Sequence, residues 1–297
     1  MSSTDFSVGW CTNILPTRSA KDLASALHAL STHLPQGVPI GLWLPDTLIG
    51  DDPVASIQPI RKMLDQIGSP VLGLNAFPQH DFHAARVKDD VYRPSWAAPD
   101  RADYTIRAAK ALVALREGDS TDDALGLTTV PIGWTAHAID LKAAAEQLNE
   151  TCRHLQRIGQ QAGRTVFLAI EPEPGCILST AHDVSQFVAT HDLEWACRDG
   201  VLRACLDACH LAVENESPQA ALESLSSVDM SIGRIQVSSA IEARDSEGIA
   251  ALQLLDEPRW MHQTNVFRDD QTVCYGDLPE ALHEPASGIW RTHMHVP

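Results

Sequence analysis

The chain has 297 residues, of which 44% are hydrophobic and 21% are charged, and its formal net charge at pH 7 is -17. This composition is typical of a folded globular chain, and the negative charge disfavours nucleic acid and anionic lipid surfaces as partners. No stretch approaches the ~20 apolar residues of a membrane helix, and the N-terminus "MSSTDFSVGW" lacks a signal-peptide pattern, so we expect a cytoplasmic protein with no direct membrane insertion.

Apolar runs typical of β-strands alternate with helix-type stretches along the whole chain. After the first run, leucines in residues 23–34 recur at spacings of three and four, and Ser19 is the expected N-cap of that helix. After the fourth run, an apolar stripe covers residues 141–155, and Gly159 and Gly163 are expected to end it. The strand candidates are "FSVGWCTNI" (6–14), "VPIGLWLP" (38–45), "PVLGLNAFP" (70–78), "ALGLTTVPIGW" (124–134), "TVFLAIEPEP" (165–174), "VLRACLDACH" (201–210), "IGRIQVSSAI" (232–241) and "WRTHMHVP" (290–297).

This alternation predicts an α/β fold of the (β/α)8 type, a TIM barrel, built as a single domain over residues 1–297. No G-x-G-x-x-G follows the first strand candidate, which removes the main support for a dinucleotide-binding, doubly wound sheet. Two regions, 79–99 and 243–289, are longer than ordinary connections. In a barrel both would be loops on the catalytic face, at the C-terminal ends of the strands.

Two carboxylates follow the fifth strand candidate, in the stretch "AIEPEPGC". The two prolines beside them hold the backbone extended, so Glu171 and Glu173 are expected to point to the same side. The next strand candidate leads to Asp207, and His210 follows at the same rim. Because catalytic groups in barrels come from several strand ends, this pattern favours a site, with an acidic, solvated turn as the alternative.

These residues also resemble a known family. "LDACH" after "AIEPEPGC" resembles the sugar isomerase/epimerase superfamily with the xylose-isomerase-like TIM barrel, in which Glu, Asp, His and Glu from the last four strands hold one divalent metal. More specifically, "VGWCTNILP", "LGLNAFPQHDFHAARVKDDVYRPSW", "IEPEPGC", "LDACHLAVENE", "IQVSSA", "MHQTN" and "RTHMHVP" resemble the metabolite traffic protein EboE family over nearly the whole chain. The resemblance implies that Glu171 and Asp207 bind a divalent metal ion (Zn, Mn or Mg) and that His210 contacts the substrate.

The chain departs from the superfamily pattern in two places. Gln236 in "IQVSSA" stands where the isomerases usually have a His ligand, and a neutral amide is a weaker ligand. Members of the family continue past "HVP" to a strand with a further Glu, so either this sequence is truncated after Pro297 or the barrel closes with "WRTHMHVP" and is incomplete at its C-terminus. His293 and His295 share one face of that strand, and they are either metal ligands or ordinary polar side chains near the chain end.

Other candidates lie near strand ends and in the two long regions. Asn13 and Asn75 are expected to bind substrate hydroxyl groups, and Lys88 and His262 are weaker candidates for substrate contacts. Glu173 and His210 are the candidates for proton transfer.

Two functions remain open from the sequence. The first is a metal-dependent isomerase or epimerase acting on a small polyol-like or cyclic metabolite. The resemblance links this activity to metabolite traffic and to partner proteins from the same gene cluster. The second is a non-catalytic metabolite-binding or escort protein that kept the barrel pocket, because fold does not decide function. Gln236 favours the second function, whereas the "IEPEP" and "LDACH" stretches favour the first.

Overall fold

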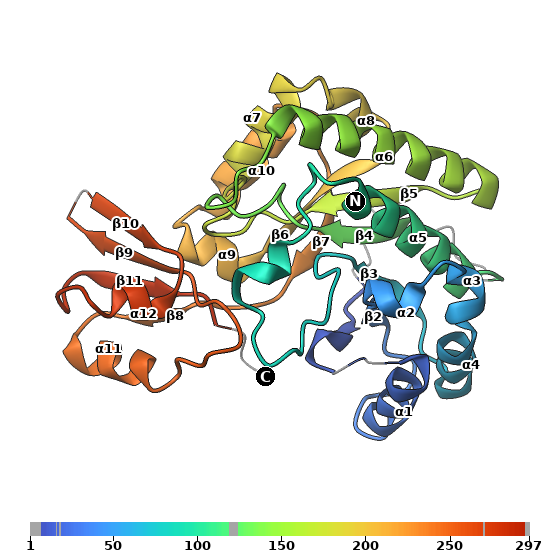
Figure 1. Cartoon of the computed structure of the whole chain (residues 1–297), viewed down its shortest axis with the longest axis horizontal. Coiled ribbons are helices and arrows are strands. Elements are labelled where there is room, and N and C mark those ends of the chain that lie inside the picture. Colours follow the sequence, from blue (N-terminus) through green and yellow to red (C-terminus); the bar gives the residue numbers. More distant parts are fainter. Residues whose placement is uncertain (1–6, 16, 18, 119–123, 270, 295–297) are drawn as a thin grey trace, which may run out of the picture.

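The chain folds into a curled parallel sheet wrapped by helices, beside a small antiparallel sheet (Figure 1). The computed structural model describes residues 7–15, 17, 19–118, 124–269 and 271–294. Within these ranges no helix combines the length and the apolar character needed to cross a membrane.

In the described part of the chain seven strands pair in parallel, each beside the next one in chain order. They correspond to the first seven strand candidates, which confirms the expected alternation of strands and helices. The parallel strands are β1 (Trp10–Cys11), β2 (Ile40–Trp43), β3 (Val71–Asn75), β4 (Leu125–Thr129), β5 (Val166–Ile170), β6 (Leu202–Asp207) and β7 (Ile232–Gln236).

Helices cover the outer face of this sheet (Figure 1). The first one begins after Ser19, whose hydroxyl accepts a hydrogen bond from the backbone N–H of Asp22, as expected of an N-cap. The longest one ends at Gly163, which has φ 66°, whereas Gly159 lies inside it. The helices of this part are α1 (Ala20–Ser31), α2 (Asp46–Ile49), α3 (Pro53–Ser56), α4 (Gln58–Ile67), α5 (Pro99–Leu115), α6 (Leu141–Ala162), α7 (Ala181–Thr190), α8 (Glu194–Arg198), α9 (Ala208–Val213) and α10 (Pro218–Ser226), with the 3-10 helices η1 (Thr12–Ile14) and η2 (Lys88–Tyr92).

Alternate side chains of β5 lie on opposite faces of the sheet and belong to different hydrophobic clusters. Ile170 belongs to the large hydrophobic core between the sheet and the helices. Phe167 and Ala169 alternate with it and belong to a separate cluster with Cys205 of β6, on the inner side of the curl. The next inward position after Ala169 is Glu171, at the end of the strand. The strand pattern itself therefore aims this carboxylate at the barrel mouth.

The C-terminal part differs from the prediction. It forms a four-stranded antiparallel sheet in the order β10-β9-β11-β8, with a small hydrophobic cluster of its own around Val266 and Trp290. The region 243–289 is therefore not the long loop that was expected, and "WRTHMHVP" contributes a strand to this sheet and not to the barrel. The elements are β8 (Ile241–Ala243), α11 (Ser246–Gln253), β9 (Thr264–Arg268), β10 (Gln271–Tyr275), α12 (Leu278–Ala281) and β11 (Ile289–Thr292).

A tight hairpin explains this difference. Arg268 of β9 pairs with Gln271 of β10, and Asp269 between them has φ 49°, in the left-handed region that two-residue hairpin turns use. Strand β9 of the hairpin pairs with one edge of β11 in antiparallel orientation, and β8 pairs with the other edge of β11. In the described residues the barrel consequently has seven parallel strands and is incomplete, in agreement with the predicted fold class. The single domain over residues 1–297 stays a prediction.

The loop of residues 79–99 joins the small sheet to the barrel. Its Lys88 N–H donates to the carbonyl oxygen of Arg259 at 2.8 Å, and the Lys88 ammonium lies 2.6 Å from Asp277 Oδ2. In the other direction, the Trp260 indole N–H donates to the carbonyl oxygen of Phe82 at 3.0 Å. Phe82 and Lys88 of this loop line one cavity with Glu171 and Asp207, so the loop lies at the barrel mouth, as expected for the catalytic face.

Candidate metal centre

Four ionisable side chains meet at the carboxyl ends of β5 and β6, in a cavity of about 510 Å³. Glu171 and Glu173 follow β5, Asp207 ends β6, and His210 lies in α9. None of them is more than 8% exposed. One potential ligand atom each from Glu171, Asp207 and His210 lie within 4.8 Å of one another. The prediction that the Glu171 and Asp207 carboxylates share a pocket is confirmed.

Asp207 is held in place by the first turn of α9. Its Oδ1 atom accepts hydrogen bonds from the backbone N–H groups of Cys209 at 2.7 Å and His210 at 3.2 Å, which makes it the N-cap of that helix. The Ser238 hydroxyl donates to the same oxygen at 2.5 Å. Among the described residues these bonds all end on Oδ1, so Oδ2 is the oxygen with which Asp207 would contact a cation.

His210 is oriented by the turn that carries the two glutamates. Its Nδ1 atom lies 2.7 Å from the carbonyl oxygen of Pro172, which can only accept a hydrogen bond, so Nδ1 carries a proton. In the neutral ring Nε2 then has the free lone pair. Metal-binding imidazoles commonly donate one N–H to a carbonyl and bind the metal through the other nitrogen.

Burial and the short distances between the carboxyl groups make their ionised forms unfavourable unless a positive charge lies among them. Burial raises the pKa of Glu171 to about 8, although the nearby His210 opposes the rise. Burial alone would lower the pKa of His210, but the neighbouring carboxylates, Asp207 first, outweigh it and raise that pKa to about 9. A proton or a metal ion can each compensate such a cluster, and a divalent cation would displace the proton from His210.

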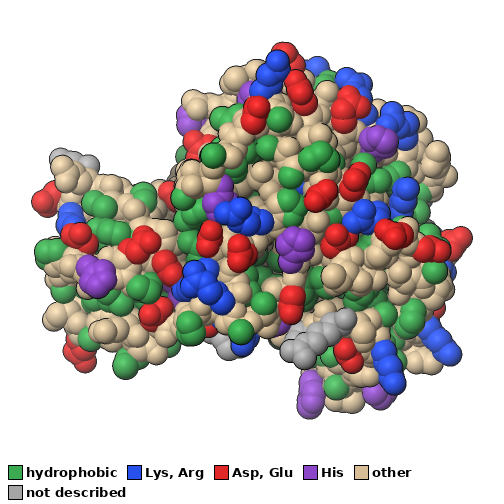
Figure 2. Space-filling view, in the orientation of Figure 1, with side chains coloured by type: hydrophobic (Ala, Val, Ile, Leu, Met, Phe, Trp, Pro, Cys, Tyr) green, Lys and Arg blue, Asp and Glu red, His purple; other side chains and the backbone are tan. Residues whose placement is uncertain are grey.

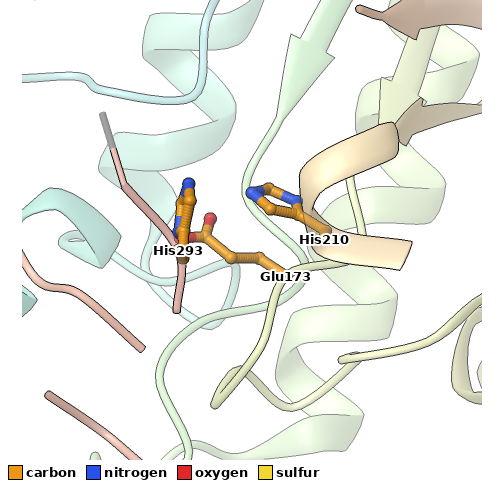
Figure 3. Close-up of side chains that lie close together, drawn as sticks. All are labelled: Glu173, His210 and His293. Carbon is orange, nitrogen blue, oxygen red and sulfur yellow. The ribbon is translucent and has the colours of Figure 1, made fainter. Parts of the chain in front are cut away.

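Glu173 is fixed by hydrogen bonds from two distant parts of the chain. Its Oε1 atom accepts from the Tyr92 hydroxyl at 2.7 Å and from the Gln263 amide at 2.8 Å. Nδ1 of His293 lies 2.9 Å from Gln263 Oε1 and donates to it. Figure 3 shows that Glu173, His210 and His293 turn toward one another, and the centroids of the two imidazole rings are 4.7 Å apart. His293 thus lies in the barrel mouth, as expected.

Gly175, in the turn after β5 that also carries Glu173, leaves room for the Trp134 ring, which packs against Tyr92. Gly175 has φ 79°, and a Cβ atom there would come within 2.3 Å of the Trp134 ring. Trp134 in turn stacks on Tyr92, with ring centroids 5.0 Å apart and planes at 13°. The stretch "EPEPGC" therefore positions Glu173. Through Gly175 it also makes room for Trp134, the ring that stacks on Tyr92, and Tyr92 donates a hydrogen bond to Glu173.

Tyr92 and Gln263 are site residues that the sequence analysis did not identify. The sequence offers only a weak signal for them, because Gln263 is the neighbour of His262 in "MHQTN" and Tyr92 lies in the unusual loop 79–99. Their bonds to Glu173 join residues 81 and 90 positions apart. Contacts of this kind depend on the tertiary fold.

Among the described residues, two groups of side chains have the geometry to hold a cation. The first is Glu171, Asp207 and His210, and the second is Glu173, His210 and His293. Each combines carboxylate oxygen with imidazole nitrogen, a donor set that suits Zn²⁺ or Mn²⁺ better than Mg²⁺, which prefers oxygen alone. The residues present therefore fit the divalent metal that the resemblance implies.

Three further predicted residues line the same cavity, namely Asn13, Asn75 and Gln236. The Asn75 side-chain oxygen accepts a hydrogen bond from the Thr128 hydroxyl at 3.0 Å, which orients its amide. The Gln236 amide donates to the Cys205 sulfur at 3.6 Å, so it lies over the inner cluster of the barrel. Their roles as substrate or metal contacts stay predictions.

The other predicted residues have different surroundings. Lys88 lines the cavity, but its ammonium group is paired with Asp277. His262 is absent from the lining and is buried behind His293, with its Nδ1 3.1 Å from the His293 carbonyl oxygen. Its neighbour Met261 faces the cavity instead, so His262 does not lie where a substrate contact was expected. The predicted ligand His295 lies outside the described residues.

No protein-family model matches the sequence, and no curated protein matches it either. Solved structures do resemble the fold. A D-tagatose 3-epimerase-like protein aligns with a TM-score of 0.51 at 14% sequence identity, covering 81% of this chain and 76% of that one. D-psicose 3-epimerase from Clostridium cellulolyticum H10 has a TM-score of 0.47 at 15% identity, over 76% of this chain and 71% of its own. The 3-keto-D-glucoside 4-epimerase YcjR from E. coli has a TM-score of 0.46 at 11% identity, over 84% of this chain and 100% of its own.

At these identities the likeness concerns the fold alone. It agrees with the seven parallel strands in chain order and with the helices on their outer face. The chain therefore has the fold of a xylose-isomerase-like TIM barrel, incomplete in its described residues.

Proposed function

We propose that this chain holds a divalent cation between Glu171, Asp207 and His210 and isomerises or epimerises a small polyhydroxylated metabolite. The observation that carries the proposal is the convergence of two buried carboxylates and an oriented imidazole at the carboxyl ends of neighbouring barrel strands. The cavity of about 510 Å³ has the size of a small-molecule site. A sugar-like substrate is in keeping with the D-tagatose 3-epimerase-like neighbour in fold.

Glu173 is the proposed carrier of the proton. A bound divalent cation would act as a Lewis acid on a carbonyl or hydroxyl oxygen of the substrate. Burial raises the pKa of Glu173, while the hydrogen bonds from Tyr92 and Gln263 favour its carboxylate form. A carboxylate with a raised pKa is suited to take a proton from the substrate and return it.

The two histidines extend this proton-carrying site. Nδ1 of His293 is 4.0 Å from Glu173 Oε1, and the His210 ring packs edge-on against the His293 ring. His210 belongs to both candidate ligand groups, so it links the cation to Glu173. The burial of all three side chains keeps a transferred proton away from bulk water.

Gln236 supports a second candidate function, a binding or escort protein without catalysis. Its amide donates a hydrogen bond to the Cys205 sulfur. An amide at this position is a weaker metal ligand than an imidazole would be. The connection with metabolite traffic and with partner proteins from the same gene cluster is a further part of the proposal and follows from the sequence resemblance alone. A cytoplasmic location is also part of the proposal, and it follows from the N-terminal sequence and the lack of a long apolar stretch.

Metal analysis tests the proposal. Elemental analysis of protein purified without added metal comes first, followed by calorimetric titration of the metal-free protein with Mn²⁺. Asp207→Asn removes the charge but keeps an efficient N-cap for α9. We expect this variant to bind Mn²⁺ about 100-fold more weakly, which corresponds to about 2.7 kcal/mol. Glu223→Gln, which changes an exposed carboxylate on α10, is the control and should bind like the parent.

Two results decide between the outcomes. An unchanged Mn²⁺ affinity in Asp207→Asn would contradict the site. If the parent binds Mn²⁺ but never exchanges carbon-bound hydrogen of ketose probes with deuterated water, the escort function is favoured over catalysis.

A further inference from the structure

We infer that Arg259 and Trp260 form a subsite for an anionic substituent, a phosphate or carboxylate group, on the metabolite. This inference rests on the proposed function in one respect, since it takes the cavity to be the substrate site. It narrows the substrate class from polyhydroxylated metabolites in general to acidic ones, such as sugar phosphates and sugar acids.

Arg259 brings to the cavity wall a positive charge that is not paired within the described residues. Lys88 also lines the cavity, but Asp277 neutralises it at 2.6 Å. Within the described part of the chain, the Arg259 guanidinium makes no hydrogen bond or ion pair, and its Cζ atom lies 5.1 Å from the centroid of the Trp260 ring. A guanidinium stacked on a ring keeps its edge of N–H donors available, and that edge matches a phosphate or carboxylate in bidentate geometry.

The backbone of Arg259 is fixed on both sides. Its carbonyl oxygen accepts hydrogen bonds from the N–H groups of Val87 and Lys88, each at 2.8 Å. Its own N–H donates to Glu257 Oε2 at 2.9 Å, and the next N–H, that of Trp260, donates to Glu257 Oε1 at 2.7 Å. The base of the arginine side chain is therefore held at the junction between the loop 79–99 and the small sheet.

The Trp260 side chain, which lines the cavity, is also fixed by its neighbours. Its ring stacks on Phe82 with centroids 5.6 Å apart, and its indole N–H donates to the Phe82 carbonyl oxygen at 3.0 Å. His83 packs against it edge-on at 6.2 Å. A rigid aromatic face that also lines the cavity offers an apolar surface to the C–H groups of a substrate whose charged end reaches Arg259.

The charges that line the cavity come from different parts of the fold. The buried carboxylates belong to the ends of β5 and β6, whereas Arg259 belongs to the segment before β9. The chain as a whole carries -17, and Figure 2 shows Lys and Arg side chains next to Asp and Glu side chains near the junction of the barrel and the small sheet. A substrate with hydroxyl groups toward the carboxylates and an anionic group at Arg259 would bind in a single orientation.

Matched probes test the subsite. Mn²⁺-loaded parent protein, Arg259→Gln, Arg259→Lys and Arg86→Gln are titrated by calorimetry with D-fructose, D-fructose 6-phosphate and D-gluconate. Arg86 is the control, because it is an exposed arginine of the neighbouring loop 79–99 that does not line this cavity. We expect the parent and Arg86→Gln to bind one anionic probe at least about tenfold more tightly than D-fructose. Arg259→Gln should lose this preference with unchanged Mn²⁺ affinity, and Arg259→Lys should keep part of it.

The outcomes separate the subsite from the proposed function. A preference for the phosphate or for the carboxylate probe identifies the anionic group. Equal affinities of the parent for all three probes, or equal losses in the Gln variants of Arg259 and Arg86, would overturn the subsite. If Mn²⁺ fails to bind while the anionic preference still depends on Arg259, the subsite stands and the metal-dependent function fails.

Discussion

A single hydroxyl group tests whether Glu173 is a charged member of the site. Tyr92 is 1% exposed, its hydroxyl donates to Glu173 at 2.7 Å, and it accepts from the Gln263 amide at 2.6 Å. Tyr92→Phe removes both bonds but keeps the ring that stacks on Trp134. The variant therefore changes hydrogen bonding at the carboxylate with almost no change in packing.

The expected magnitude follows from the charge of the acceptor. A hydrogen bond to a charged group contributes about 1.5–3 kcal/mol to stability, against about 1 kcal/mol for a neutral pair. We therefore expect Tyr92→Phe to lower the free energy of unfolding by about 2–3 kcal/mol at pH 8. The loss should be smaller at pH 5, because the bond from Tyr92 favours the carboxylate form of Glu173 and lowers its pKa.

A second buried tyrosine provides the control. The Tyr104 hydroxyl donates to the neutral carbonyl oxygen of Leu44 at 2.9 Å, so Tyr104→Phe should cost about 1 kcal/mol at either pH. Urea unfolding of the metal-free variants, followed by circular dichroism at pH 5 and pH 8, measures both losses. Equal, pH-independent losses in the two variants would refute the view that Glu173 is ionised in the folded protein.

Two further predictions concern groups outside the candidate centre. Burial raises the pKa of Glu214 to about 7 from 4.5, so the folded state keeps a proton that the unfolded state has lost, and stability falls as pH rises between these values. Since one pKa unit corresponds to about 1.4 kcal/mol, Glu214→Gln should reduce that fall by about 3 kcal/mol, and an unchanged pH slope in urea unfolding would contradict the assignment. Lys88→Met leaves Asp277 without its partner at 2.6 Å and should cost about 2 kcal/mol, whereas Arg244→Met, in an exposed pair, should cost less than about 0.5 kcal/mol. Similar losses in these two variants would show that the Lys88 pair contributes no more than a surface contact.

The first candidate ligands were predictable because they depend on local rules. Alternation along β5 sends Glu171 to the inner side after Phe167 and Ala169, and the same rule applies to Asp207 after Cys205. Parallel strands in chain order then bring the two carboxyl ends together. None of these steps requires knowledge of distant contacts, so the sequence was sufficient for them.

The support of the site was not predictable in the same way. Tyr92 and Gln263 reach Glu173 only because the loop 79–99 and the small sheet pack over the barrel mouth. The hairpin of β9 and β10 had a local signal in the alternation of "TNVFRDDQTVCY", but this segment was interpreted as a loop. Because the strands of the small sheet were missed, the partner of β11 was missed as well.

His293 shows what strand parity determines and what it leaves undetermined. Parity fixes which side of a strand a residue faces, and the prediction that His293 faces the barrel mouth agrees with its position beside Glu173 and His210. Parity does not determine with which strand β11 pairs. In the structure β11 pairs with β9 of the small sheet, not with a barrel strand. That pairing places His293 beside Gln263, whose carbonyl oxygen accepts the His293 N–H at 2.8 Å and whose side chain accepts from its ring. The small sheet therefore brings an imidazole, together with the group that orients it, to the barrel mouth, where the sequence had suggested an eighth barrel strand.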